Sequence, residues 1–189
     1  MDKTYADTVR LLLAVAPDVF ANDIFAMKGG TAINLFVRDM PRLSVDIDVV
    51  YLPWQTPRDE ALQAINQELA AIATRVAPLG VQTRLVRAKD LGDTKLIVEN
   101  DASQVKIEVN VVFRGSVLPV ERRPLSAKTS DLFGVEFELP ILAPDELYAS
   151  KLVAALDRQH PRDLFDVWQL YESGDTSDGM VACFVIYLA

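Results

Sequence analysis

The fold is decided by Lys28-Gly29-Gly30-Thr31 and by the later segment Ser44-Val45-Asp46-Ile47-Asp48. The glycine pair stands between a short apolar run and a helical pattern, and the second segment alternates as a strand does. Side chains at positions i and i+2 of a strand share a face, so Asp46 and Asp48 are expected to project together, opposite the apolar residues around them. The order strand, glycine turn, helix and strand predicts one compact supersecondary unit.

This arrangement favours metal-assisted nucleotidyl transfer. Two neighbouring carboxylates repel each other, and a hard cation with oxygen ligands, such as magnesium, relieves that repulsion and can also grip triphosphate oxygens. Gly29 and Gly30 permit unusual backbone angles and close approach, and the free N–H groups of the following helix start attract phosphate. Each motif alone also fits ordinary turn chemistry, and it is their order and phasing that favour function.

Composition limits the alternatives. The chain has 189 residues, half of them apolar, which is room for one domain and part of a second. A net charge of -8 excludes broad, non-specific coating of nucleic acid. The segment Gln104–Lys128 carries five basic and two acidic residues, net +3, which fits either a local basic face or scattered solvated charges.

The single cysteine, Cys183, excludes a disulfide framework or a cysteine-based metal site within one chain. It fits a reducing, cytoplasmic location. The N-terminal segment lacks the layout of a signal peptide, and no apolar run is long enough to cross a membrane.

The periodicity predicts an α+β fold, a mixed sheet with helices on one side. Expected helices cover residues 5–20 with a break at Pro17, 31–37, 57–76, 144–158 and 162–171; expected strands cover residues 24–27, 44–48, 81–86, 95–99, 105–113 and 135–139. We expect one domain over residues 1–140. Residues 141–189 begin a helical C-terminal region that looks truncated, because the final apolar run ends without a cap or polar tail.

Several later residues are candidates whose alternatives stay open. Glu108 lies mid-strand on a polar face, where a solvent-facing glutamate is the simpler reading. Lys151 and Arg158 share one helix face. On the next helix Asp163 and Asp166 lie one turn apart, where they could also serve the helix dipole or a surface ion pair.

Two blocks resemble the AbiEii/AbiGii nucleotidyltransferase toxins, which include the MenT-type toxins and belong to the DNA polymerase β superfamily. The first block is residues 28–32 with residues 43–48. The second is residues 151–158 followed by Pro161-Arg162-Asp163-Leu164-Phe165-Asp166. The resemblance covers nearly the whole chain, and it implies a polymerase β-like nucleotidyltransferase sheet followed by helices.

The resemblance also implies roles for individual residues. The catalytic set is Asp46, Asp48, Glu108, Lys151 and Asp166, and the nucleotide-binding set is Lys28, Gly29, Gly30, Thr31, Ser44, Lys151, Arg158 and Arg162. Asp46, Asp48 and Glu108 would hold magnesium or manganese. Lys151 would neutralise triphosphate charge, and Glu108 or Asp166 would take the proton of the attacking hydroxyl.

The function implied is that of a toxin from a toxin–antitoxin, abortive-infection system. It would transfer a nucleoside monophosphate from a triphosphate to an acceptor, the 3′ end of tRNA, and a cognate antitoxin would restrain it. Two alternatives stand beside this function: a nucleotidyltransferase that modifies a small molecule, and an inactive nucleotide-binding interaction module.

Overall fold

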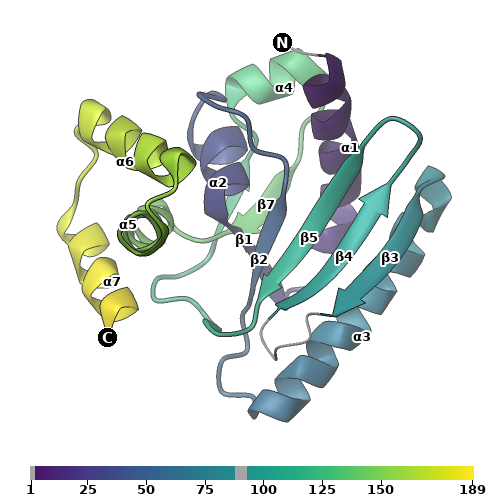
Figure 1. The fold of residues 1–189 in the computed structure, drawn as a ribbon, viewed down its shortest axis with the longest axis horizontal. Coiled ribbons are helices and arrows are strands. Elements are labelled where there is room, and N and C mark those ends of the chain that lie inside the picture. The colour runs from purple at the N-terminus through teal and green to yellow at the C-terminus, as the bar shows by residue number, and fades with distance from the viewer. Residues whose placement is uncertain (1–2, 88–92) are drawn as a thin grey trace.

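A seven-stranded mixed sheet forms the centre of the protein (Figure 1). The structure is a computed structural model that describes residues 3–87 and 93–189. The strands are β1 (Phe25–Lys28), β2 (Ile47–Tyr51), β3 (Gln82–Arg87), β4 (Asp93–Glu99), β5 (Gln104–Asn110), β6 (Glu121–Pro124) and β7 (Glu138–Ile141). Their order is β3-β4-β5-β2-β1-β7-β6, which makes β2 the middle strand. The pairs β2–β5 and β1–β7 are parallel and the others are antiparallel, so the predicted mixed sheet is confirmed.

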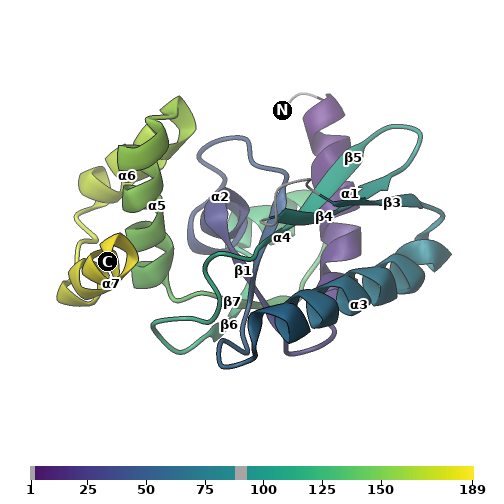
Figure 2. The same ribbon diagram turned by 60° about the horizontal axis from the view of Figure 1, so that its bottom comes forward.

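Helices surround the sheet unevenly. They are α1 (Lys3–Val19), α2 (Gly29–Ala32) with a π-helical continuation (Ile33–Val37), α3 (Arg58–Val76) with a 3₁₀ turn (Ala77–Leu79), α4 (Ala127–Phe133), α5 (Pro144–Arg158), α6 (Pro161–Ser173) and α7 (Asp178–Leu188). Helices α1 and α3 pack on one face, against β5 and against β3 and β4 (Figures 1 and 2). Helices α5, α6 and α7 pack together beside the sheet, so the helices do not all lie on one side as expected.

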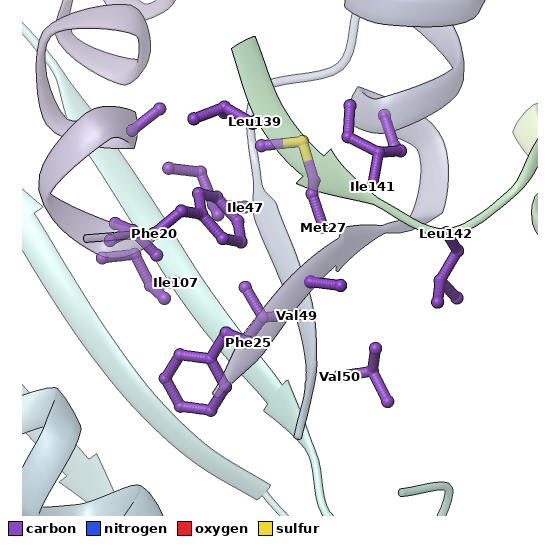
Figure 3. Close-up of a cluster of buried hydrophobic side chains, with 14 of the residues drawn as sticks. Phe20, Phe25, Met27, Ile47, Val49, Val50, Ile107, Leu139, Ile141 and Leu142 are labelled. Atoms are coloured by element: carbon purple, nitrogen blue, oxygen red, sulfur yellow. The ribbon is translucent and has the colours of Figure 1, made fainter. Parts of the chain in front are cut away.

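The hydrophobic core lies between the sheet and helices α1 and α3. On β5, Val105, Ile107 and Val109 are buried while Lys106 is exposed, which confirms the predicted alternation. Figure 3 shows Ile107 close to Ile47 of β2 within the buried cluster, and both side chains are fully inaccessible to solvent. Because the apolar residues fill this face, the polar residues of β2 and β5 are left on the opposite face.

Some element boundaries differ from those predicted. The strand expected at 44–48 begins only at Ile47, so Asp46 lies in the preceding connection. The strand expected to reach residue 113 ends at Asn110, because the Asn110 side chain accepts hydrogen bonds from the N–H groups of Val112 and Phe113 and turns the chain. Pro17 does not break the first helix but lies inside α1.

Two elements were not predicted, β6 and α4. The β6 sequence is charged and ends in proline, which is typical of a short edge strand and gives no apolar alternation. Helix α4 is short, and its start is capped by Ser126, whose hydroxyl accepts from the N–H of Thr129. The expected domain boundary at residue 140 falls within β7, and the division into domains stays a prediction.

The five basic residues of Gln104–Lys128 lie on several elements: Lys106 on β5, Arg114 in the connection that follows it, Arg122 and Arg123 on β6, and Lys128 on α4. Three strands separate β5 from β6 in the sheet. No helix within residues 3–87 and 93–189 combines the length and apolarity that crossing a membrane requires.

Candidate active site

Two carboxylates lie side by side on the central strands. Parallel pairing of β2 with β5 places Asp48 opposite Glu108, between flanking pairs of buried apolar residues. Both acids therefore lie on the polar face of the sheet. Asp46 precedes the strand by one residue, and its charge acts on Asp48.

The pKa of Asp48 is raised from 3.8 to about 6. Burial is the largest cause, followed by the negative charges of Glu108 and Asp46, while the ammonium groups of Lys28 and Lys151 act in the opposite direction. Burial and the two neighbouring acids together disfavour the ionised form of Asp48, and an added cation would favour it.

The glycine turn lies directly against this acid. Gly29 has φ +77°, and a Cβ atom there would overlap the carboxylate of Asp48. Only glycine can adopt this positive φ and also leave room for the Asp48 carboxylate without strain. The preceding residue, Lys28, pairs with Asp48 across β1 and β2, so both side chains lie on the same face. Burial lowers the pKa of Lys28, the charges of Lys151 and Arg158 lower it further, and Asp48 and Glu146 oppose the shift.

A cavity of about 530 Å³ is lined by both acids and by cationic side chains of β1 and α5. Asp48 and Glu108 line it on the sheet side, and Lys28, Lys151 and Arg158 add three positive charges. The cavity thus brings carboxylates and cationic side chains together, as a site for a metal-bound polyphosphate requires.

The donor set fits a hard divalent cation, because carboxylate oxygens dominate it and the charges of Glu108 and Asp46 both act on Asp48. In the present arrangement Glu108 binds Lys95 of β4, with Nζ 3.0 Å from Oε1. Within the described ranges, no group of three or more His, Cys, Asp or Glu side chains is already gathered around a common metal position. Binding an ion with all three predicted ligands would therefore require a rearrangement of these side chains from the positions in this structure.

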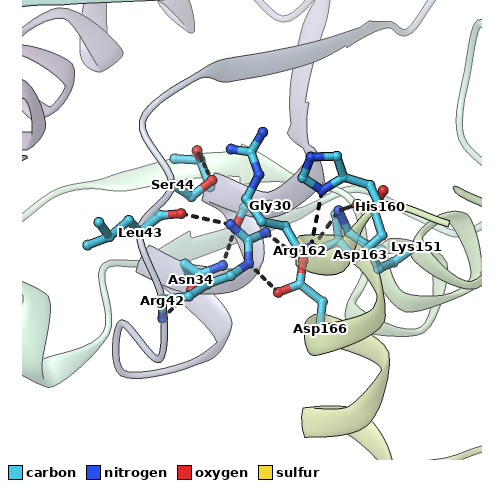
Figure 4. A network of polar contacts seen from close by, with 12 residues as sticks. Gly30, Asn34, Arg42, Leu43, Ser44, Lys151, His160, Arg162, Asp163 and Asp166 are labelled. Atoms are coloured by element: carbon cyan, nitrogen blue, oxygen red, sulfur yellow. Dashed lines mark hydrogen bonds and ion pairs between the residues drawn. The ribbon is translucent and has the colours of Figure 1, made fainter. Parts of the chain in front are cut away.

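A second group of charges holds Lys151 in place (Figure 4). Its Nζ lies 2.9 Å from Asp163 Oδ1 and 3.3 Å from Asp166 Oδ2, and all three side chains are almost fully buried. Asp166, only 1% exposed, is also bound through both oxygens by Arg42, at 2.6 Å from Nε and from Nη2. Bidentate pairing of this kind is strongly directional. Arg158, 61% exposed, binds the second oxygen of Asp163.

The structure places Gly30, Thr31, Ser44 and Arg162 outside the cavity lining. Gly30 packs so closely on Arg42 that a Cβ would overlap the guanidinium. Thr31 is fully buried, and its hydroxyl lies 3.0 Å from that of Ser44. Arg162 is exposed at the start of α6, where its N–H donates to His160 Nδ1.

Within the described part of the chain, the residues lining the cavity include Lys28, Gly29, Asp48, Glu108, Lys151 and Arg158, and do not include Gly30, Thr31, Ser44, Asp46, Arg162 or Asp166. Two residues with direct contacts to the predicted set were missed by sequence reasoning, Arg42 and Lys95. Lys95 could be found only with the strand register known, since it pairs with Glu108 across β4 and β5. Arg42 lies 124 residues from Asp166, and no local pattern indicates that contact.

Comparisons with known proteins identify the family of this chain and a solved structure with the same fold. The family model described as nucleotidyl transferase AbiEii toxin, type IV TA system, matches residues 10–189. Among solved structures, MenT4, a nucleotidyltransferase toxin from Mycobacterium tuberculosis H37Rv, has the same fold with a TM-score of 0.63 and 20% sequence identity. The match covers 98% of this chain and 66% of that one, so the chain spans slightly less than two thirds of its neighbour's length. None of the curated protein sequences matches significantly. The match over residues 10–189 shows that this chain belongs to the AbiEii family of nucleotidyltransferase toxins from type IV toxin–antitoxin systems.

Proposed function

We propose that this protein transfers a nucleoside monophosphate from a nucleoside triphosphate to an acceptor hydroxyl, with release of pyrophosphate. The observation that carries the proposal is the cavity with Asp48 and Glu108 on one side and Lys28, Lys151 and Arg158 on the others. Catalysis of this kind depends on positioning and charge neutralisation, which are what these side chains can supply.

Asp46, Asp48 and Glu108 would hold Mg²⁺ through their carboxylate oxygens. When bound, the ion offsets charge on the triphosphate and strengthens the electrophilicity of the α-phosphorus. The raised pKa of Asp48 supports this assignment, because an added positive charge removes the repulsion from which the shift partly arises.

The cationic side chains would bind the triphosphate. Lys151 is held on its own helix face by Asp163 and Asp166, so its ammonium is oriented before the nucleotide arrives. Arg158 has one bond, to Asp163, and enough exposure to reach phosphate oxygens. Lys28 adds a third positive charge beside Asp48.

For the transfer itself we assign proton acceptance to Glu108 rather than to Asp166. The acceptor oxygen forms a bond to the α-phosphorus, the bond to the pyrophosphate oxygen breaks, and the hydroxyl proton goes to the carboxylate. Glu108 lines the cavity and is partly exposed, whereas both oxygens of Asp166 are engaged by Arg42 and Lys151. Asp166 is therefore assigned a positioning role.

We further propose that the acceptor is the 3′ end of tRNA, that the enzyme acts in the cytoplasm, and that a cognate antitoxin restrains it. The family assignment supports the antitoxin, since type IV toxin–antitoxin systems contain one. The tRNA acceptor rests on the resemblance to the family of residues 28–32 with 43–48 and of residues 151–158 with 161–166.

The test is transfer of label from each α-labelled nucleoside triphosphate, with Mg²⁺, in the presence and absence of total tRNA. We expect label on tRNA with the wild-type protein and none with Asp48→Asn, while Asp23→Asn, an exposed change outside the cavity, behaves as wild type. Transfer that is unaffected by Asp48→Asn would refute the site. Label on a small molecule instead of tRNA would support the small-molecule alternative, and nucleotide binding with no transfer to any acceptor would support the inactive module.

A further inference from the structure

A second, smaller cavity of about 200 Å³ adjoins the transfer cavity. Phe113 and Tyr187 line both, and Trp54 lines the smaller one from the connection after β2. Three aromatic rings from distant parts of the chain thus meet beside the place where a nucleotide is expected. The volume is below the roughly 300–1,000 Å³ of pockets for drug-sized ligands and suits a single planar ring system.

The rings are held in position by the surrounding structure. The Tyr187 hydroxyl donates to Glu146, 2.9 Å away, and the Phe113 and Tyr187 ring centroids are 5.1 Å apart. Glu146 is fully buried and also accepts from the backbone N–H groups of Val117 and Leu118, so it cannot turn away. Tyr187 is therefore fixed as a hydrogen-bond donor, and burial together with Glu146 raises its pKa.

The Trp54 side chain packs closely against Gly115. Gly115 has φ +82°, its N–H donates to the carbonyl of Tyr51, and a Cβ there would crowd the Trp54 side chain. Yet Trp54 remains 60% exposed and Phe113 remains 43% exposed. Exposed aromatic groups gathered at a cavity mark a binding surface.

We propose that this cavity binds a nucleobase by stacking against Trp54 and Phe113. Every base presents an aromatic face, and proteins hold bases of single-stranded nucleic acids and nucleotides on such rings. The base belongs either to the triphosphate or to the terminal nucleotide of the acceptor, because Phe113 and Tyr187 line both this cavity and the transfer cavity. The inference rests on the proposed function for the origin of the base, and its test is separable from that function.

The chain allows a direct binding test because it has only two tryptophans, Trp54 and Trp168. Trp168 lies on α6 beside Phe165 and does not line either cavity. In Trp168→Phe protein, fluorescence reports on Trp54 alone. The probes are each nucleoside triphosphate, a short single-stranded RNA with a free 3′ end, and inorganic triphosphate, all with Mg²⁺.

Quenching by a nucleoside triphosphate but not by inorganic triphosphate supports the proposal and assigns the base to the donor. Quenching by the RNA alone supports it and assigns the base to the acceptor. No quenching by either, or equal quenching by inorganic triphosphate, overturns it. If quenching occurs in a protein that transfers no label, the proposed function fails and the base site stands.

Transfer kinetics give a second, independent readout. Trp54→Ala should raise the KM for the base-bearing partner about 5- to 150-fold, the range that loss of one stacking ring produces. Trp54→Phe should restore most of the affinity. Trp168→Ala removes a ring of similar exposure, 52% accessible to solvent, and should leave the KM unchanged. Unchanged KM in both Trp54→Ala and Phe113→Ala would contradict the proposal.

Discussion

Replacing Asp48 with asparagine should stabilise the metal-free protein while abolishing transfer. The pKa of Asp48 lies at about 6 in the folded state against 3.8 for the unperturbed group. A raised carboxyl pKa means that the ionised form is penalised in the fold, so the penalty is present above pH 6 and is lost as pH falls towards 3.8. At about 1.4 kcal/mol for each pH unit between these values, ionised Asp48 costs the folded state about 3 kcal/mol near neutral pH.

Urea unfolding with a chelator present measures this cost. For a slope of roughly 2 kcal/mol per molar urea, Asp48→Asn should raise the unfolding midpoint by about 1.5 M at about pH 7.5. The same linkage predicts that the difference falls to about 1 kcal/mol near pH 4.5, where the folded wild type is largely protonated. Asp23→Asn, an exposed change elsewhere, should leave the midpoint unchanged.

Excess Mg²⁺ supplies the complementary result. An ion at about 100 times its dissociation constant stabilises the state that binds it by about 2.7 kcal/mol, so the wild type should regain most of the difference and Asp48→Asn should not respond. The reasoning would be refuted if Asp48→Asn were no more stable than wild type without metal at neutral pH. It would equally be refuted by a stability difference that did not change between neutral and acidic pH.

Three further changes test separate parts of the site. Lys151→Met should lower the free energy of unfolding by about 3–5 kcal/mol, because it leaves two buried carboxylates of α6 without their ammonium partner. An unchanged melting temperature would show that these ion pairs do not contribute to stability. Gly29→Ala should lower stability by more than Gly80→Ala, since both glycines have positive φ but only the first has the β2 carboxylate where a Cβ would stand; equal losses in urea unfolding would contradict this. Lys95→Met should tighten Mg²⁺ binding about 2- to 5-fold by releasing Glu108, with the affinity read by calorimetry; weaker binding would show that the lysine assists the metal site instead.

Local spacing was enough to predict part of the site. Strand alternation predicted that Asp48 would lie on a polar face, and the glycine pair predicted a turn that only glycine can make, as the positive φ of Gly29 confirms. The helix of residues 144–158 was predicted with its exact ends from Pro144 and the acids of its first turn. These features depend on neighbours within a few residues.

The parts that local spacing could not predict depend on long-range pairing, and for Glu108 the resemblance alone indicated a place beside Asp48. The alignment of Asp48 with Glu108 follows from β2 and β5 becoming parallel neighbours, although three elements separate them in the chain. For Lys151, the sequence and the resemblance indicated only a position on one helix face and a role in neutralising triphosphate charge. It does line the cavity, but it is also 9% exposed and bound to two carboxylates, which the helical spacing did not reveal.

Arg42 links the chain segment that leads to the acidic residues of β2 with the helices that carry the basic residue Lys151. It lies in the connection that leads to Asp46 and β2, and it grips Asp166 on α6, which in turn holds Lys151 of α5. Each of these contacts is made by a charged group with little exposure to solvent, so breaking any one leaves a buried charge without its partner. A shift of the C-terminal helices relative to the sheet therefore cannot occur without disturbing Lys151. The geometry of Asp46 and Asp48 and that of Lys151 are consequently set together, although more than 100 positions separate these acids from the lysine in the chain.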